Sequence, residues 1–301
     1  MAINIEIKAG TYNLVVMIDG EVTVTGFEGG GSRLIIPESI EVDGQNMCIT
    51  HIAPKAFFAN KELQQAYLPA SVTHIGDWAF ASCENLKEFT CLNRGAMSSL
   101  GRGVFDNCHR IENVLVGYEE KDDLSALMAA IIDRMPAEYL LRDEDIGNDN
   151  WFLKWDQCLS TYLNEPDIDG YTDLVLCGEE DIFYNEPDFA MNKRRKKCSL
   201  CMLRLIYSSA ISEETRKKYT DYILSHNKGC ETEEAWDEIL ANHGEDTAYY
   251  KLLFDIGGIN KDNIDDMLED MGEYHAEAKA YMLAIKQEHF SVADFFDEFE
   301  L

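Results

Sequence analysis

Residues 49–111 repeat one order of apolar and polar positions. Three copies are present, ITHIAPKAFFANKEL (residues 49–63), VTHIGDWAFASCENL (72–86) and LGRGVFDNCHRI (100–111). Their shared phenylalanines, Phe57, Phe80 and Phe105, are 23 and 25 residues apart. Neither a helix nor a strand alone has such a period, so the pattern indicates a structural repeat.

A unit of this length holds one short strand, a turn and a short helical segment. One unit cannot bury its own Phe and Leu, but stacked units bury them in a continuous ladder. A partial earlier copy, TGFEGGGSRLIIPESI (residues 25–40), supplies a strand and Pro37, which is echoed by Pro69. The glycine-rich part of this copy (residues 26–32) lies between repeat strands and is interpreted as a turn.

After the repeats the chain takes a helical period. Asn-Glu-Pro-Asp occurs twice, from Asn164 and from Asn185, where proline stops or starts a helix. Ser212 and Thr232 are expected to cap the helices that follow them. The pattern predicts helices at residues 122–134, 151–163, from 190 onward, 213–226, 233–242, 247–256, 262–271, 276–288 and 292–299.

These patterns predict an α+β protein. A short repeat solenoid is expected over residues 1–119, and an all-α domain of stacked helix pairs over residues 120–301. With 301 residues, the chain is long enough for two domains of ordinary size.

The repeat resembles the leucine-rich repeats of the BspA-like (Treponema-type) family over residues 22–116. The resemblance is carried by Ile75-Gly76, Ala79-Phe80, Cys83 and Leu86, with counterparts Ile52, Ala56-Phe57, Asn60 and Leu63. Members are mostly bacterial solenoids that bind other proteins, and the resemblance implies that fold and a protein partner here. Residues 258–287 resemble a degenerate ankyrin-type helix pair, without the Thr-Pro-Leu-His start.

Charge narrows the class of partner. The chain has 56 acidic and 26 basic residues, a formal net charge of -30, and its last 71 residues hold 20 acidic against 4 basic side chains. Such a field repels nucleic acid and anionic membranes and attracts basic proteins. The sequence therefore predicts a basic protein partner and argues against direct nucleic-acid binding.

The same sequence predicts a cytoplasmic protein. No basic start followed by a long apolar run is present, and the longest apolar stretch (residues 124–132) is shorter than the roughly 20 residues that span a bilayer. The nine cysteines follow no disulfide framework. No membrane association is expected.

Several motifs have a functional and a structural interpretation. KRRKK (residues 193–197) is either a nucleic-acid patch or a solvated helix start paired with neighbouring acids, which the net charge favours. Cys198 and Cys201, with His226 and Cys230, have the residue types of a zinc site, but they read as helix interior. In EPDIDGYTDLVL (residues 165–176), Glu165 and Pro166 take the first two positions of a calcium loop and Leu176 takes the place of the closing Glu, which favours a turn entering a strand.

Catalysis finds no support in the motifs. The sequence lacks G-x-S-x-G, G-x-x-x-x-G-K-[ST], H-E-x-x-H and the Rossmann glycines, and Cys177 lies among acids that disfavour a thiolate. No enzyme, metal or cofactor is expected. Near the C-terminus, Phe295, Phe296 and Phe299 form either a cap on the preceding helices or an acidic-aromatic peptide for a partner.

The sequence thus predicts a non-catalytic interaction or scaffold protein. Two groups of polar residues are candidate binding positions, Thr50, His51, Thr73 and His74 on the repeats, and Asp265, Asp266, Glu269 and Asp270 on the acidic helices. His51 and His74 should stack on adjacent strands, as a metal or pH-sensitive pair or as ordinary surface residues. The acids either bind the partner or only maintain solubility. An alternative function is an acidic mimic of nucleic acid that inhibits a DNA- or RNA-binding protein.

Overall fold

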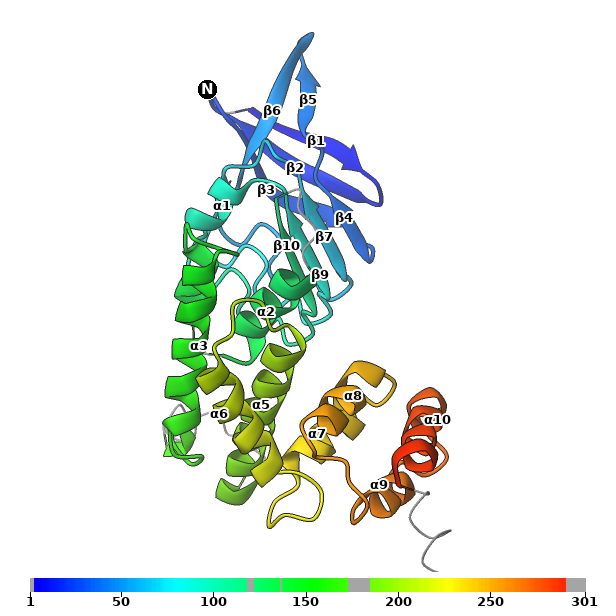
Figure 1. The fold of residues 1–301 in the computed structure, drawn as a ribbon. Coiled ribbons are helices and arrows are strands. Elements are labelled where there is room, and N and C mark those ends of the chain that lie inside the picture. Colours follow the sequence, from blue (N-terminus) through cyan, green and yellow to red (C-terminus); the bar gives the residue numbers. More distant parts are fainter. Residues whose placement is uncertain (1–2, 118–121, 136, 173–184, 291–301) are drawn as a thin grey trace, which may run out of the picture. The chain divides into compact units, whose positions relative to one another are not determined.

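The computed structural model describes the chain apart from residues 1–2, 118–121, 136, 173–184 and 291–301 (Figure 1). The chain divides into two compact units, Met1–Cys158 and Leu159–Leu301. All strands among the described residues belong to the first unit, and helices make up the second. The α+β class that the sequence predicts is confirmed.

One sheet of the first unit begins with three antiparallel strands, β1 (Ile3–Ala9), β2 (Tyr12–Ile18) and β3 (Val22–Gly29). It continues through parallel pairing of β3 with β6 (Gln45–Ile52), which also pairs with β5 (Ser39–Val42) and β8 (His74–Ile75). In β2 the side chains of Tyr12, Leu14 and Val16 are buried and alternate with more exposed ones. This period of two places one face of the strand on the core.

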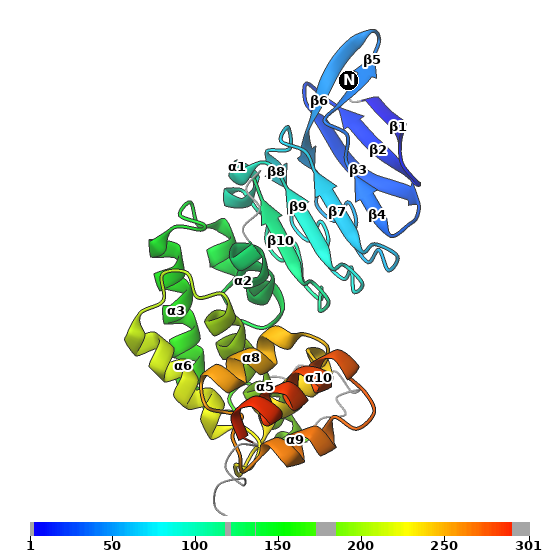
Figure 2. The same ribbon diagram turned by 45° about the vertical axis from the view of Figure 1, so that its right-hand side comes forward.

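The second sheet consists of β4 (Arg33–Ile35), β7 (Gln65–Leu68), β9 (Glu88–Cys91) and β10 (Asn113–Val116). All neighbours in it are parallel, in the order β10-β9-β7-β4 (Figure 2). Each repeat contributes one strand, so the sheet grows by one strand per unit, as a solenoid requires.

Between the two sheets runs the phenylalanine ladder that the repeat period predicts. The rings of Phe57 and Phe80 stack with their centroids 5.1 Å apart, and those of Phe80 and Phe105 with 6.3 Å between centroids. Phe27 extends the ladder by one rung, 5.6 Å from Phe57. All of the residues from which the ladder was predicted are buried, which confirms the repeat solenoid.

The connections between strands differ from the predicted short helices. In the copies at residues 49–63 and 72–86, the segments around Phe57 and Phe80 are successive turns, with Lys55 and Trp78 at left-handed φ of 60° and 55°. Backbone bonds run from one repeat to the next, such as Phe57 N–H to Ala79 O at 2.8 Å. Because these bonds satisfy the backbone between repeats, the turns need no helical bonding of their own.

Helices close the far end of the solenoid. α1 (Arg94–Ser98) follows β9, and α2 (Asp122–Asp133), the 3₁₀ turn η1 (Glu138–Arg142) and the start of α3 (Asp149–Asn164) belong to the first compact unit. Trp151 and Trp155 are fully buried and donate to the backbone oxygens of Leu140 and Leu127, at 3.0 and 3.3 Å. The two compact units divide after Cys158, 39 residues beyond the domain boundary predicted at residue 119, which stays a prediction.

The second unit contains α5 (Glu186–Ile206), α6 (Glu213–Ser225), α7 (Glu234–Asn242), α8 (Thr247–Asp255), α9 (Ile264–Asp270), α10 (Ala276–Ile285) and a π-helical turn, η2 (Lys286–Phe290). α5 is its centre and contacts α6, α7 and α8. Residues 292–299 lie outside the described residues, and the ankyrin resemblance remains a prediction.

Most predicted helix boundaries are close to those observed. Asn164 ends α3, and Asn185 caps α5 by accepting from the backbone N–H of Asp188 at 3.0 Å. Ser212 caps α6 as predicted, with Thr215 N–H as donor. Thr232 is not the cap of α7: the N-cap residue is Glu233, and its side chain makes no capping bond.

Candidate functional site

The outer face of the β4-β7-β9-β10 sheet presents a regular array of side chains. Along each strand, buried residues alternate with outward ones, and the parallel register aligns the outward residues across the sheet. One row contains Arg33, Gln65, Glu88 and Asn113. The other row, named the apolar row here, contains Ile35, Tyr67, Thr90 and Leu115.

The apolar row is unusual because large hydrophobic side chains face solvent on a rigid sheet. Ile35 is 44% exposed and Tyr67 is 37% exposed, and they are direct neighbours in the register. In the polar row, Gln65 Nε2 donates to Glu88 Oε2 at 2.8 Å, which fixes both side chains. Preorganised aromatic and aliphatic groups with a polar flank are characteristic of protein-binding surfaces.

The sequence analysis did not select the apolar row. Its residues occupy the outward positions that alternate with buried ones in the strand sequences RLI, QAYL, EFTC and NVLV. An outward position in a half-buried strand is normally polar, so Ile35, Tyr67 and Leu115 were the signal.

Thr50, His51, Thr73 and His74 are brought together as predicted. His51 pairs with His74 in the β6–β8 register, and the two ring centroids are 5.5 Å apart. His51 is half-buried, with Nδ1 2.9 Å from Thr50 Oγ1 and 3.2 Å from Glu21 Oε2. Thr73 and His74 are exposed. His51 already has internal partners, and the Thr73 hydroxyl donates to the backbone oxygen of Thr50 at 3.2 Å, so His74 is the member of this group best placed for a partner.

The four predicted acids lie on α9 and are all exposed, but two of them have internal roles. Asp270 Oδ2 accepts from Trp236 Nε1 at 2.8 Å and pairs with Lys228 Nζ at 2.8 Å. Asp265 pairs with Lys286. Asp266 and Glu269 are therefore the members of the group whose charge is best placed for an external partner.

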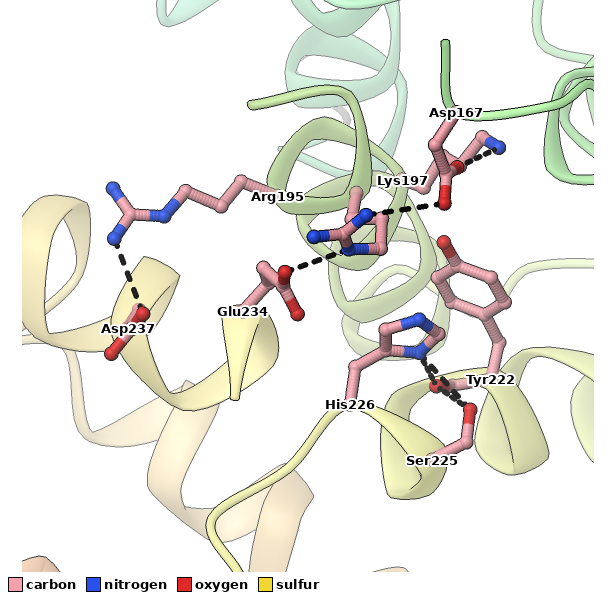
Figure 3. A network of polar contacts seen from close by, with 9 residues as sticks. Asp167, Arg195, Lys197, Tyr222, Ser225, His226, Glu234 and Asp237 are labelled. Carbon is pink, nitrogen blue, oxygen red and sulfur yellow. Dashed lines mark hydrogen bonds and ion pairs between the residues drawn. The ribbon is translucent and has the colours of Figure 1, made fainter. Parts of the chain in front are cut away.

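The basic motif at residues 193–197 is the centre of a polar cluster in the helical unit, named the α5 cluster here (Figure 3). Its cations are Lys193, Arg194, Arg195 and Lys197, and its acids are Glu165, Asp167, Glu234 and Asp237. Lys197 is 1% exposed, and its Nζ donates to Asp167 Oδ1 and to the backbone oxygen of Glu165, both at 2.7 Å.

Other contacts hold the turn that follows α3 (residues 165–170) against α5. Lys193 Nζ lies 3.1 Å from Glu165 Oε2 and donates to the backbone oxygen of Asp169 at 3.0 Å. Lys193 and Lys197 also lie over the ring of Tyr162, with their Nζ atoms 5.5 and 5.7 Å from its centroid. The prediction of pairing with acidic neighbours is confirmed. Lys193, Lys197 and Glu234 are buried, whereas the other members of these pairs keep 21–43% of their side chains exposed.

These contacts also explain the segment that was compared with a calcium loop. Its carboxylates Glu165 and Asp167 hold lysine and arginine side chains of α5, and residues 173–176 lie outside the described residues. Two motifs that looked independent in the sequence thus neutralise each other in the fold.

Arg194 links the turn to α7. Its Nε donates to Glu234 Oε1 at 2.7 Å, and its Nη1 lies 3.5 Å from Asp167 Oδ2. Burial tends to raise the pKa of the Glu234 carboxyl, but hydrogen bonds from Thr232 and Arg194 outweigh it and hold this pKa below its ordinary value. Glu234 is therefore an anion at neutral pH, as the arginine requires.

This shift predicts a pH dependence of stability. A lowered pKa in the folded state stabilises the fold above the unfolded pKa of about 4.3, and the stabilisation is lost as pH falls through the folded value. Glu234→Gln should lower the free energy of unfolding at pH 7 and flatten its decline below about pH 5. Urea titrations at several pH values measure this, with the exposed Glu214→Gln as control. Parallel curves for wild type and Glu234→Gln would contradict the assignment.

Of the four residues considered for zinc, only the two cysteines of α5 belong to the helical core: His226 is half-buried, and Cys230 is exposed with its Sγ donating to the backbone oxygen of Leu224 at 3.2 Å. Cys198 and Cys201 are fully buried in α5, and burial raises the pKa of both thiols well above the ordinary value. His226 Nδ1 lies 2.9 Å from the backbone oxygen of Tyr222, and its ring stacks on Tyr222 at 4.4 Å (Figure 3). Within the described residues, no group of three or more His, Cys, Asp or Glu is arranged to hold a metal ion.

The remaining candidates have structural positions or cannot be placed. The glycine-rich segment at residues 26–32 starts within β3, which extends to Gly29, and becomes a turn only afterwards. Cys177, Phe295, Phe296 and Phe299 lie outside the described residues. No described helix is both long and apolar enough to cross a membrane.

Comparison with known proteins identifies the repeats. Residues 39–121 match the family model described as BspA type leucine rich repeat region (6 copies), which confirms the resemblance in that region. No curated protein matches the sequence.

Several solved structures are similar over part of the chain. A leucine rich cell surface protein from Faecalibacterium prausnitzii is 24% identical over 37% of this chain and 31% of its own, with a TM-score of 0.32. The Treponema pallidum leucine rich repeat protein is 24% identical over 38% of this chain and 54% of its own, with a TM-score of 0.30. A leucine-rich repeat protein from Bacteroides capillosus is 21% identical over 38% of this chain and 99% of its own, with a TM-score of 0.28. This chain thus spans about a third of the length of the first of these structures.

Proposed function

We propose that the protein is a non-catalytic interaction protein that binds a basic protein partner through the outer face of its repeats. The observation that carries the proposal is the apolar row, in which Ile35 and Tyr67 are exposed side by side on a sheet. Leucine-rich repeat proteins generally mediate protein–protein interactions, and solenoids use such extended sheet faces for binding.

A basic partner is supported by where the chain keeps its charges. The net charge is -30, and the largest basic cluster is consumed by internal acids, with Lys197 and Lys193 buried. The electrostatic potential around the molecule is therefore negative, which speeds encounter with a basic surface. Asp266 and Glu269 on α9 are exposed members of this acidic surface.

A cytoplasmic location accompanies this proposal. All eight cysteines among the described residues are free thiols, as is usual for proteins kept in a reducing compartment. The buried thiols of Cys83 and Cys108 hydrogen-bond to backbone oxygens of the neighbouring repeat, at 3.2 and 3.3 Å. Burial raises their pKa to about 11 and about 12, so they support the fold as neutral thiols rather than as nucleophiles.

Affinity capture from lysate of native cells tests the proposal, with wild type compared against the double variant Ile35→Asp, Tyr67→Lys. We expect a protein of high isoelectric point to be captured by wild type and reduced at least about tenfold with the double variant, because a charge replaces each anchor. Tyr274→Lys, an exposed tyrosine on the helical unit, is the matched control and should capture normally.

Three results would contradict the proposal. The first is capture that survives the double variant, and the second is a captured protein that is acidic. The third concerns the nucleic-acid mimic: if added DNA displaces the captured protein at constant salt, the alternative function replaces this one.

A further inference from the structure

The phenylalanine ladder ends in a pocket of about 290 Å³ inside the first unit. Its floor is Phe105, the last ring of the ladder, which also meets Phe89 at 4.8 Å between centroids. Ile131 and Ile132 of α2, with Met135 and Leu141, form further apolar walls. The pocket thus gives solvent access to the end of the repeat core.

Two carboxylates, Asp106 and Glu138, are the charged residues of the lining. Glu138 is held in place because its Oε1 accepts from Arg142 Nη2 at 2.9 Å and from Gly103 N–H at 3.4 Å. Arg142 in turn donates to the backbone oxygens of Leu100 and Gly101, both at 2.9 Å. Asp106 is exposed on the turn that carries Phe105, and it lines the pocket.

We propose that this pocket receives one apolar side chain of the basic partner, while a neighbouring Lys or Arg of that partner pairs with Asp106. This inference rests on the proposed function and assigns it a second contact point. The volume is at the small end of the range of about 300–1,000 Å³ that is usual for small-molecule sites, and it has room for a single large apolar side chain.

Charge selects a basic partner over the other occupants. A second copy of the chain brings its own net charge of -30, which opposes self-association. The chain's own residues 291–301 include phenylalanines but carry four acidic and no basic side chains, so the Asp106 carboxylate at the pocket repels them. A peptide with an apolar residue between basic ones matches both the walls and the charges.

Selection from a phage-displayed library of random 12-residue peptides tests this with the full chain. We expect enriched peptides to contain one large apolar residue flanked by Lys or Arg. The affinity of a synthetic enriched peptide, measured by fluorescence anisotropy, should fall at least about tenfold with Asp106→Lys and with Ile132→Trp, which fills the half-buried mouth. Glu41→Lys, the same charge reversal on exposed β5, should change it less than about twofold.

The results of this selection distinguish peptide binding at the pocket from peptide binding at the outer sheet face. Enrichment of acidic or uncharged peptides, no enrichment, or affinity that survives both pocket variants would overturn the inference. Loss of binding with Tyr67→Lys alone would also overturn it, yet leave the proposed function standing. If deletion of residues 291–301 is needed before any peptide binds, the chain's own C-terminal segment is the occupant, and the inference fails.

Discussion

Phe80→Ala should destabilise the first unit by about 3–5 kcal/mol, the largest effect expected of any single change in the repeats. Phe80 is fully buried and contacts three other rings, Phe57, Phe105 and Phe89, with centroids 5.1, 6.3 and 5.4 Å away. Truncation removes the apolar surface and leaves a cavity between rungs that the backbone bonds on either side hold apart.

The effect should be large because the stability of a solenoid depends on contacts between neighbouring repeats. Phe80 is an inner rung of the ladder, between Phe57 and Phe105, so its loss weakens the interfaces on both sides of it. Phe58→Ala is the matched control, since Phe58 is adjacent to a ladder residue in sequence but 47% exposed, and it should cost less than about 1 kcal/mol. The stability losses of both variants are measured by urea unfolding, with hydrogen exchange in peptides from residues 39–117 as the probe. Similar losses for the two variants would show that the ladder is not the core.

Lys197→Met should destabilise the helical unit by about 3 kcal/mol. The change leaves Asp167 without its closest cation and the backbone oxygen of Glu165 without its donor, in a site where Lys197 itself is 1% exposed. Asp167 keeps 31% of its side chain exposed, so water compensates part of the loss and the cost stays at the lower end of the roughly 3–5 kcal/mol expected when one partner of a fully buried pair is removed. Arg194 remains 3.5 Å from Asp167, which keeps the loss below the extreme of this class.

Lys196→Met is the matched control, because Lys196 is the next residue along the chain and is exposed. Its loss should cost less than about 1 kcal/mol. Urea unfolding followed by circular dichroism at 222 nm reports mainly on the helices, and therefore on this unit. A loss for Lys197→Met no greater than that for Lys196→Met would mean that the α5 cluster does not hold the turn at residues 164–172.

The repeat core was predictable because its signal is periodic. Nearly equal spacing of Phe57, Phe80 and Phe105 predicts equivalent positions in stacked units, and the three rings stack as expected. Phe27 was missed, since its partial copy lacks the Ala-Phe step of the others. The first two strands were also missed, although INIEIKA and YNLVVMI alternate, because they precede the repeat and pair antiparallel instead of following its rhythm.

The connections were mispredicted for a physical reason. Short helices and successive turns contain similar residues, and nothing local in the sequence favours left-handed φ at Lys55 or Trp78. The backbone hydrogen bonds that compensate for this unfavourable conformation come from the next repeat, which is not local in sequence.

The candidate sites also divide into those that the repeat period predicts and those that depend on tertiary packing. The register of His51 with His74 followed from the repeat and is confirmed. The pairs of the α5 cluster join residues 27 to 42 positions apart, and only the packing of the segment after α3 against α5 brings Asp167 to Lys197. Sequence spacing could suggest that the cations pair with acids, but not with which ones. The pocket at Phe105 depends on how α2 and η1 close the last repeat, which no local pattern encodes.

Photocrosslinking from the apolar row tests the central claim most directly. With p-benzoylphenylalanine in place of Tyr67, irradiation of native cells should join the protein to one partner of isoelectric point above about 9, identified by mass spectrometry. The same group in place of Tyr274 should not give that product. Equal crosslinking from both positions, or none from position 67, would contradict the claim that the outer sheet face binds a basic protein.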